Sequence, residues 1–209
     1  MSNTFKDYIL QPNDELMGLT QLVNGFDQNG QACEINVVEE QPLTIFLNGQ
    51  EIVTAMTIGD YPQYLALGFL KNQGMLTDNE NILGIDYDDE LQTVVVRTDG
   101  KTIYEEKLKK KTRTSGCAVG TVFGDMMEGL ENLKLPNVEF KVSWLYELSN
   151  IINQTPSLYL KAGAIHGTVL CCKNKPLVYM EDVGRHNAVD KIAGLVIKNN
   201  INTSDKIFY

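Results

Sequence analysis

The sequence predicts an α/β protein, α+β overall, with a β-rich beginning and a mixed second half. From residue 34 to residue 108, short runs of β-branched residues alternate with turn residues, which is typical of strands. Further on, helical patterns alternate with such runs, and the last helix has a clean i, i+3, i+4, i+7 apolar repeat. Residues 1–33 are polar and weakly periodic, which indicates a peripheral N-terminal extension.

Length, composition and charge limit the classes to which this protein can belong. The chain has 209 residues, 43% of them hydrophobic, enough for a real core. It shows no apolar run of the ~20 residues that cross a bilayer and no signal-peptide core, so we expect a soluble, cytoplasmic protein without a membrane partner. Four cysteines without a spaced framework predict reduced thiols. A formal charge of −9 argues against nucleic-acid binding.

The β-rich beginning is predicted as an antiparallel meander of residues 34–40, 42–49 and 51–58, with a tight hairpin turn at Asn48-Gly49. Asp60, followed by Pro62 and Gln63, resembles a helix capping box. We expect the helix that follows to be mostly buried in the core and to end at Gly74. Further strands are predicted at 82–90, 91–100 and 101–108, with a turn at Asp99-Gly100.

The second half is predicted to contain helices at 123–133 and 143–153. A stripe of five apolar residues on the second helix indicates core packing rather than a cofactor site. These residues are Trp144, Leu145, Leu148, Ile151 and Ile152. Two strands follow within 158–180, around a turn at Asn174 and Lys175. In the second half the adjacent Cys171 and Cys172 should point to opposite faces of a strand.

The last helix begins in a polar turn, EDVGRHNAVDK. Gly184 allows the backbone to approach a ligand, and Asn187 with Asp190 could cap the first turn. Cations near a helix N-terminus are unfavourable unless an anion is close, so Arg185 and Lys191 hint at a phosphate site. The alternative is internal pairing with the acids of the same segment, and the residues do not decide between the two. These acids are Glu181, Asp182 and Asp190.

The two histidines, His166 and His186, each lie in a Gly-containing turn at a strand edge. A lone histidine there is more often a hydrogen-bonded structural residue than a catalyst. The order of elements would suit a zinc deaminase, but the C-x-x-C and H-x-E segments of that class are missing. We therefore expect no metal site.

Cys117 is the best candidate nucleophile. Five of the seven positions from Lys107 to Arg113 are cationic, and nearby cations stabilise a thiolate. Residues 114–116 favour a flexible loop before the thiol. Alternatively, the cations belong to a solvated strand end and Cys117 is a small buried residue.

Three segments together resemble the formate dehydrogenase accessory sulfurtransferase family, FdhD. They are EQPLTIFLNG with LALGFLKNQG, then TRTSGC ending at Cys117, then AGAIHG followed by EDVGRHNAVDK. The resemblance runs in order from residue 34 to the C-terminus, and the last segment is highly specific.

The resemblance implies a cytidine-deaminase-like three-layer core, here residues 112–209, after a smaller β-rich subdomain with one helix at 34–111. The family takes persulfide sulfur from a cysteine desulfurase and passes it to the molybdenum or tungsten bis(pterin guanine dinucleotide) cofactor of the formate dehydrogenase catalytic subunit. It is commonly a homodimer. Cys117 matches the persulfide-carrying cysteine. The expected cofactor contacts are His166, Asp182, Gly184, Arg185, His186, Asn187 and Lys191.

Two departures bear on mechanism. Many relatives have C-x-x-C, whereas Gly120 stands at the second position here, so the persulfide has no neighbouring resolving thiol. The chain also ends at a strand-like segment, 205–209, before the family's final αβ segment, so we expect the core to lack its C-terminal end. The rival functions are a non-catalytic cofactor-binding chaperone for formate dehydrogenase maturation and, less favoured, an inactive interaction remnant.

Overall fold

The computed structural model describes residues 8–13, 15–16, 18–76, 81–100, 111–113, 121–123 and 138–209. Cys117 lies outside these residues, in the sequence between β7 (Lys111–Arg113) and β8 (Thr121–Phe123). These two strands pair antiparallel, with Arg113 opposite Thr121. Phe123 is therefore a strand residue rather than the first residue of a helix. The rest of the predicted helix, residues 124–133, and the strand predicted at 101–108 fall outside the described part.

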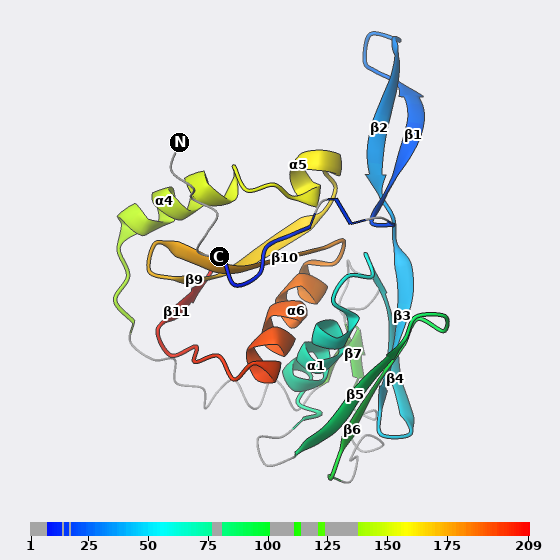
Figure 1. Ribbon diagram of the computed structural model, residues 1–209, viewed down its shortest axis with the longest axis vertical. Coiled ribbons are helices and arrows are strands. Elements are labelled where there is room, and N and C mark those ends of the chain that lie inside the picture. Colours follow the sequence, from blue (N-terminus) through cyan, green and yellow to red (C-terminus); the bar gives the residue numbers. More distant parts are fainter. Residues whose placement is uncertain are drawn as a thin grey trace.

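A two-stranded arm projects from the body (Figure 1). It consists of β1 (Thr20–Phe26) and β2 (Ala32–Val38), which pair antiparallel along their full length. At its tip the Asp27 carboxylate accepts the N–H groups of Asn29 and Gln31, both at 2.8 Å. The predicted meander is wrong at this point, because β2 pairs with β1 and not with the strand that follows it. The β1 strand was not predicted.

The four-stranded sheet has the order β4-β3-β6-β5. Its strands are β3 (Gln41–Leu47), β4 (Gln50–Thr57), β5 (Ile82–Asp88) and β6 (Thr93–Thr98). The turn predicted at Asn48-Gly49 is confirmed, since Leu47 lies opposite Gln50. Asn48 takes the positive φ of 54° that this turn needs. β3 and β6 run parallel, so the sheet is mixed.

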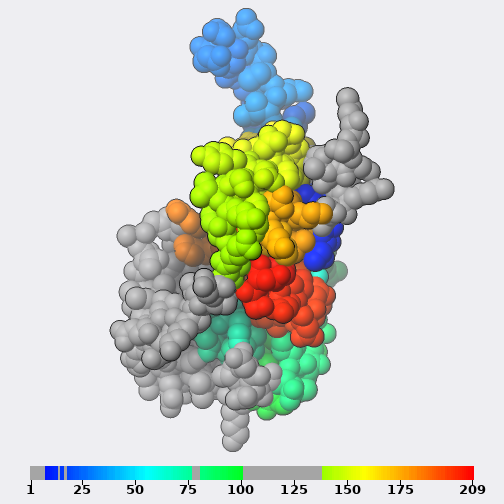
Figure 2. Space-filling model, turned by 90° about the vertical axis from the view of Figure 1, so that its left-hand side faces the viewer, coloured from blue at the N-terminus to red at the C-terminus, as the bar shows by residue number. Residues whose placement is uncertain are grey.

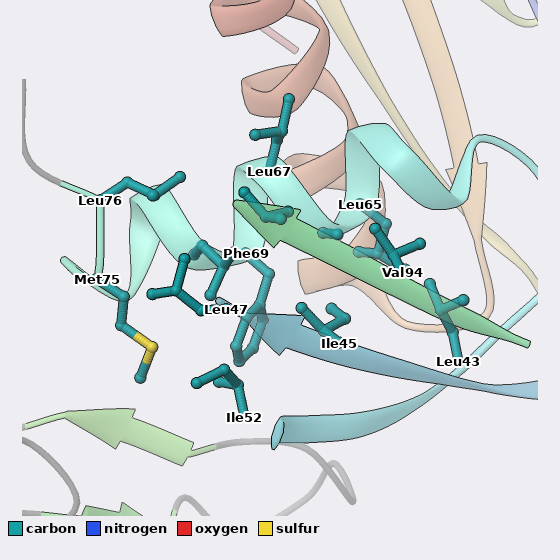
Figure 3. Close-up of a cluster of buried hydrophobic side chains, with 13 residues drawn as sticks. Leu43, Ile45, Leu47, Ile52, Leu65, Leu67, Phe69, Met75, Leu76 and Val94 are labelled. Atoms are coloured by element: carbon teal, nitrogen blue, oxygen red, sulfur yellow. The ribbon is translucent and has the colours of Figure 1, made fainter. Parts of the chain in front are cut away.

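Helix α1 (Pro62–Asn72) covers this sheet. Its residues 65–70 are buried, and they pack on strand side chains such as Leu43, Ile45 and Val94 (Figure 3). The predicted Asp60 cap is wrong. Tyr61 occupies the N-cap position in a left-handed conformation, because the Asp60 carboxylate pairs with a distant lysine, Lys191. The predicted end is confirmed, with Gly74 at φ 66°.

The second sheet has the order β10-β9-β11 and is antiparallel. Its strands are β9 (His166–Cys172), β10 (Lys175–Asp182) and β11 (Lys206–Phe208). The hairpin turn is Lys173-Asn174, one residue earlier than predicted, with Lys173 at φ 57°. Cys171 is buried and Cys172 is partly exposed, which confirms that they face opposite sides. The strand predicted at the C-terminus is β11.

Helices cover both faces of this sheet, giving a three-layer arrangement. The helices of this half are α4 (Val142–Ile152), α5 (Leu158–Ala162) and α6 (Arg185–Lys198). Leu148 and Ile152 of α4 pack on Val169 and Cys171, while Ile192 of α6 packs on the opposite face. Within the predicted stripe of α4, Leu145 is an exception and is exposed. The prediction of a mixed α/β fold is confirmed.

The two halves meet where α1 crosses α6 (Figure 1). Two glycines allow the helix backbones to touch. A Cβ added to Gly68 would lie 1.7 Å from the Asp190 carbonyl oxygen, and one added to Gly194 would lie 1.9 Å from the Tyr64 carbonyl oxygen. The crossing therefore requires the absence of a side chain at both positions. Of the helices described here, none is long and apolar enough to span a membrane.

Candidate functional site

The polar residues of the EDVGRHNAVDK segment lie where β10 ends and α6 begins. The end of β4 and the start of α1 come to the same place from the other half of the molecule. Asp182 is fully buried there, and its Oδ2 accepts the Thr57 hydroxyl at 2.5 Å. The segment thus joins the two halves through side chains as well as through the helix crossing.

Lys191 is the centre of this buried network. Its Nζ pairs with the Asp182 carboxylate at 2.6 Å and with the Asp60 carboxylate, and it donates to the Glu181 carbonyl oxygen at 3.0 Å. The lysine side chain is 0% exposed. Burial raises the pKa of Asp60, and the charge of Lys191 opposes that shift. Lys191 is therefore paired internally, but of the three acids that the sequence offered as its partners only the Asp182 carboxylate binds it. The second carboxylate, that of Asp60, was not among them.

Asn187 and Gly184 complete the network. The Asn187 side-chain amide donates to the Met56 carbonyl oxygen at 2.8 Å and to Asp182 Oδ1 at 2.9 Å. The Gly184 N–H donates to the same carboxylate oxygen at 3.0 Å. The predicted capping role is wrong, because no side chain caps the start of α6. Asp182 instead holds the turn that leads into the helix.

Three other predicted site residues, His166, Arg185 and His186, are exposed. His166 lies opposite Asp182 in the β9–β10 ladder, so it is at the same end of the sheet as the first turn of α6. In the ranges that the structure describes, no hydrogen bond or ion pair occupies these three side chains. The predicted cofactor residues therefore fall into two groups, a buried set that fixes the turn and an exposed set that can meet a ligand.

Sequence reasoning missed Thr57 and gave other roles to two further residues of this site. It read Asp60 as a helix cap and Glu181 as an acid for internal pairing. Glu181 is 2% exposed, and its carboxylate accepts the N–H groups of Leu158 at 2.8 Å and Tyr159 at 3.0 Å. It thereby satisfies the first turn of α5, and burial raises its pKa. The sequence places Glu181 in the polar segment, but its bonds to α5, 22 and 23 positions earlier in the chain, are not visible in the local pattern.

Asp190 gives a pH-dependent prediction. Burial against α1 raises the pKa of Asp190 to about 7, although Asn72 donates to its carboxylate at 2.6 Å. An unfolded Asp titrates near pKa 3.9, so the folded state binds the proton more tightly, and the free energy of unfolding falls as pH rises from about 4 to about 7. Asp190→Asn keeps the acceptor for Asn72 and removes the ionisation. We expect it to raise the melting temperature at about pH 8 and to change it little at about pH 4. An equal shift at both pH values, measured by calorimetry, would contradict this account.

The described cysteines differ in their surroundings. Burial raises the pKa of the Cys171 thiol to about 12. The Cys172 thiol lies 3.6 Å from the Asp205 carboxylate, and Cys33 is in β2 of the arm. Over the described ranges, no cluster of three His, Cys, Asp or Glu side chains could hold a metal ion.

Comparisons with known proteins bear on this site. Residues 38–209 match the FdhD/NarQ family, and this range includes every residue of the buried network. The chain belongs to the FdhD/NarQ family.

Two FdhD relatives are named sulfur carrier protein FdhD. The chain is 27% identical over 180 residues to the protein of Listeria monocytogenes, covering 84% of this chain and 69% of the relative. It is 29% identical over 177 residues to that of Bacillus subtilis, covering 83% of this chain and 67% of the relative.

The fold of this FdhD/NarQ chain is also similar to that of a solved structure. A crystal structure of a proposed formate dehydrogenase accessory protein from Desulfotalea psychrophila superimposes with a TM-score of 0.65 at 23% identity. The match covers 91% of this chain and 72% of the other. This likeness supports the mixed α/β fold.

Proposed function

We propose that this chain is a sulfur carrier in formate dehydrogenase maturation and that Cys117 carries the sulfur as a persulfide. The observation that carries the proposal is membership of the FdhD/NarQ family over residues 38–209, together with relatives named as sulfur carriers. The donor would be a cysteine desulfurase, and the acceptor the molybdenum bis(pterin guanine dinucleotide) cofactor of formate dehydrogenase, which is a substrate here.

The surroundings of the other thiols favour Cys117 as the carrier. A carrier must ionise and be reached by two partners in turn. Cys171 fails both conditions, since it is 0% exposed and burial raises its pKa to about 12. The Cys172 thiol lies 3.6 Å from the Asp205 carboxylate, whose negative charge disfavours a thiolate. Cys117 is the thiol that follows a cationic run in the sequence.

One thiol is chemically sufficient for loading. The Cys117 thiolate attacks the outer sulfur of the donor's persulfide, and a new S–S bond forms on Cys117 as the donor's S–S bond breaks. The donor cysteine leaves as a thiolate, so no electrons are gained or lost overall. With Gly120 at the position of a second thiol, the persulfide is not resolved into a local disulfide.

The exposed residues at the start of α6 suit the anionic part of the proposed substrate. The Arg185 guanidinium and the imidazoles of His166 and His186 are donors for phosphate oxygens. The buried residues beneath them would act by position: Asp182, Asn187 and Lys191 hold the turn through Gly184. The same exposed group would serve the rival function, a cofactor-binding chaperone that carries no sulfur, so the two functions differ in Cys117 and not in this surface.

A maturation assay separates the two functions. In cells that lack their own carrier, the wild-type chain should restore formate dehydrogenase activity, Cys117→Ala should leave activity at background, and the matched control Cys172→Ala should behave as wild type. Full activity with Cys117→Ala, combined with loss in Arg185→Ala, would contradict sulfur carriage and favour the chaperone.

A further inference from the structure

An open pocket lies between the two halves of the chain. The start of α1 and the end of β5 line it from one half, and the last turn of α6 lines it from the other. Figure 2 shows the halves meeting at the surface, where the red residues after α6 lie beside the green residues of β5 and β6. The pocket measures about 400 Å³, a size typical of small-ligand sites, which often lie where domains meet. Its described lining residues are Tyr61, Pro62, Gln63, Tyr64, Tyr87 and Lys198.

Three tyrosines make the wall of this pocket aromatic. The rings of Tyr61 and Tyr64 stack, with centroids 5.8 Å apart and planes inclined by 20°. The Tyr87 hydroxyl is within hydrogen-bond distance of Asp89 Oδ1 at 3.1 Å and of Gln92 Oε1 at 3.0 Å. Tyr87 therefore offers its ring rather than its hydroxyl. A flat aromatic ligand gains free energy by stacking on such rings.

The position of the Tyr61 ring is fixed before any ligand arrives. Its backbone has φ 49°, a left-handed conformation that is unfavourable for a tyrosine. The preceding residue, Asp60, is held by the buried Lys191, and the Tyr61 ring rests on Tyr64. The aromatic wall is thus preformed, which reduces the ordering that a ligand must impose.

Lys198 gives the pocket its charge, since it is the one charged residue among the six. Its Nζ lies 5.3 Å from the centroid of the Tyr64 ring and donates to Gln63 Oε1 at 3.0 Å. The Gln63 amide is held in turn, because its Nε2 donates to the Ile85 carbonyl oxygen at 3.2 Å. Within the described ranges no carboxylate forms an ion pair with Lys198. An ammonium has three donor hydrogens, so this one can also bind an anion.

We propose that this pocket binds a small anion that carries a flat aromatic ring, with the ring against the tyrosines and the anionic group at Lys198. Nucleotides and aromatic carboxylates share this chemistry. The pocket is separate from the exposed group at the start of α6, because Arg185 and Lys198 are the first and last residues of that helix, about 20 Å apart along it. The inference rests on the lining of the pocket and does not depend on sulfur transfer.

Isothermal titration calorimetry of the whole chain tests the site, with AMP, adenosine and indole-3-acetate as probes. We expect AMP to bind about tenfold more tightly than adenosine, because AMP alone offers a phosphate to Lys198. Lys198→Met should remove this difference and leave adenosine binding unchanged. Tyr61→Leu keeps an apolar side chain without a ring, and it should weaken both probes about tenfold. Binding of indole-3-acetate but not AMP, weakened by the same two variants, would identify the ligand as an aromatic acid.

Two further variants show whether the probe is in this pocket. Lys173→Met removes an exposed lysine from the β9–β10 turn, with the same change of charge, and should bind AMP as the wild type does. Arg185→Ala, at the other end of α6, should also retain AMP binding. Circular dichroism checks that all variants fold.

Three results would overturn the proposal. The first is a wild type that binds neither AMP nor indole-3-acetate with a Kd below about 1 mM. The second is binding that survives both Lys198→Met and Tyr61→Leu. The third is binding that Arg185→Ala abolishes and Lys198→Met does not, since the ligand would then lie at the start of α6. None of these results bears on the persulfide at Cys117.

Discussion

Lys191→Met should lower the free energy of unfolding by about 3–5 kcal/mol, the usual cost of removing one partner from a buried ion pair. Lys191 is the only cation that contacts Asp60 or Asp182 among the residues described, and it is fully buried. Methionine fills a similar volume, so the loss is mainly electrostatic. Two carboxylates would remain without a cation, that of Asp182 fully buried and that of Asp60 10% exposed. Urea unfolding gives the difference directly.

Two further variants define the cause of that loss. Lys198→Met removes an exposed lysine from the same helix and should change stability little. The double variant Lys191→Met with Asp60→Asn removes one of the two buried charges and should recover part of the loss. If Lys191→Met were as stable as wild type, the buried network would not hold the two halves together.

Gly194→Ala should destabilise the chain by about 2–3 kcal/mol, the upper part of the range for overpacked sites. The new Cβ would lie 1.9 Å from the Tyr64 carbonyl oxygen and 2.8 Å from its Cα. These are backbone atoms of α1, so the clash is relieved only if the helices separate. Helix propensity alone would make Gly194→Ala more stable by about 1 kcal/mol. A net loss of unfolding free energy must therefore come from the clash at the α1–α6 crossing.

Gly49→Ala is the matched control for the crossing, because a Cβ there meets nothing within 4 Å. It should cost much less than Gly194→Ala in thermal unfolding. If the two variants changed stability equally, the Cβ at position 194 would meet no clash. That result would contradict the tight α1–α6 contact.

The sequence correctly predicted those features that depend only on a few neighbouring residues. The Asn48-Gly49 turn and the opposite faces of Cys171 and Cys172 follow from backbone geometry within a few residues. The sequence also predicted that the last helix, α6, begins in a polar turn. These features depend on neighbours in sequence, so the sequence alone suffices for them.

Features that depend on distant partners could not be predicted. Asp60 fits a capping pattern, but Lys191, 131 positions away, takes its carboxylate. Asp182 and Asn187 read as ligand-binding residues because they are polar and close to a glycine, yet they bond to Thr57 and Met56 of the other half. Of the two strands of the arm, β2 was predicted but with the wrong partner. β1 was not predicted, because a strand without a core side lacks the alternation that identifies a strand.

The central claim is that Cys117 carries sulfur, and intact-protein mass spectrometry tests it most directly. Wild type, Cys117→Ala and Cys172→Ala are incubated with a cysteine desulfurase and cysteine, and the masses are compared before and after reduction. We predict one added sulfur on wild type and on Cys172→Ala, removed by reductant, and none on Cys117→Ala. An added sulfur that persists in Cys117→Ala, or a folded wild type that gains none from an active desulfurase, would contradict the claim.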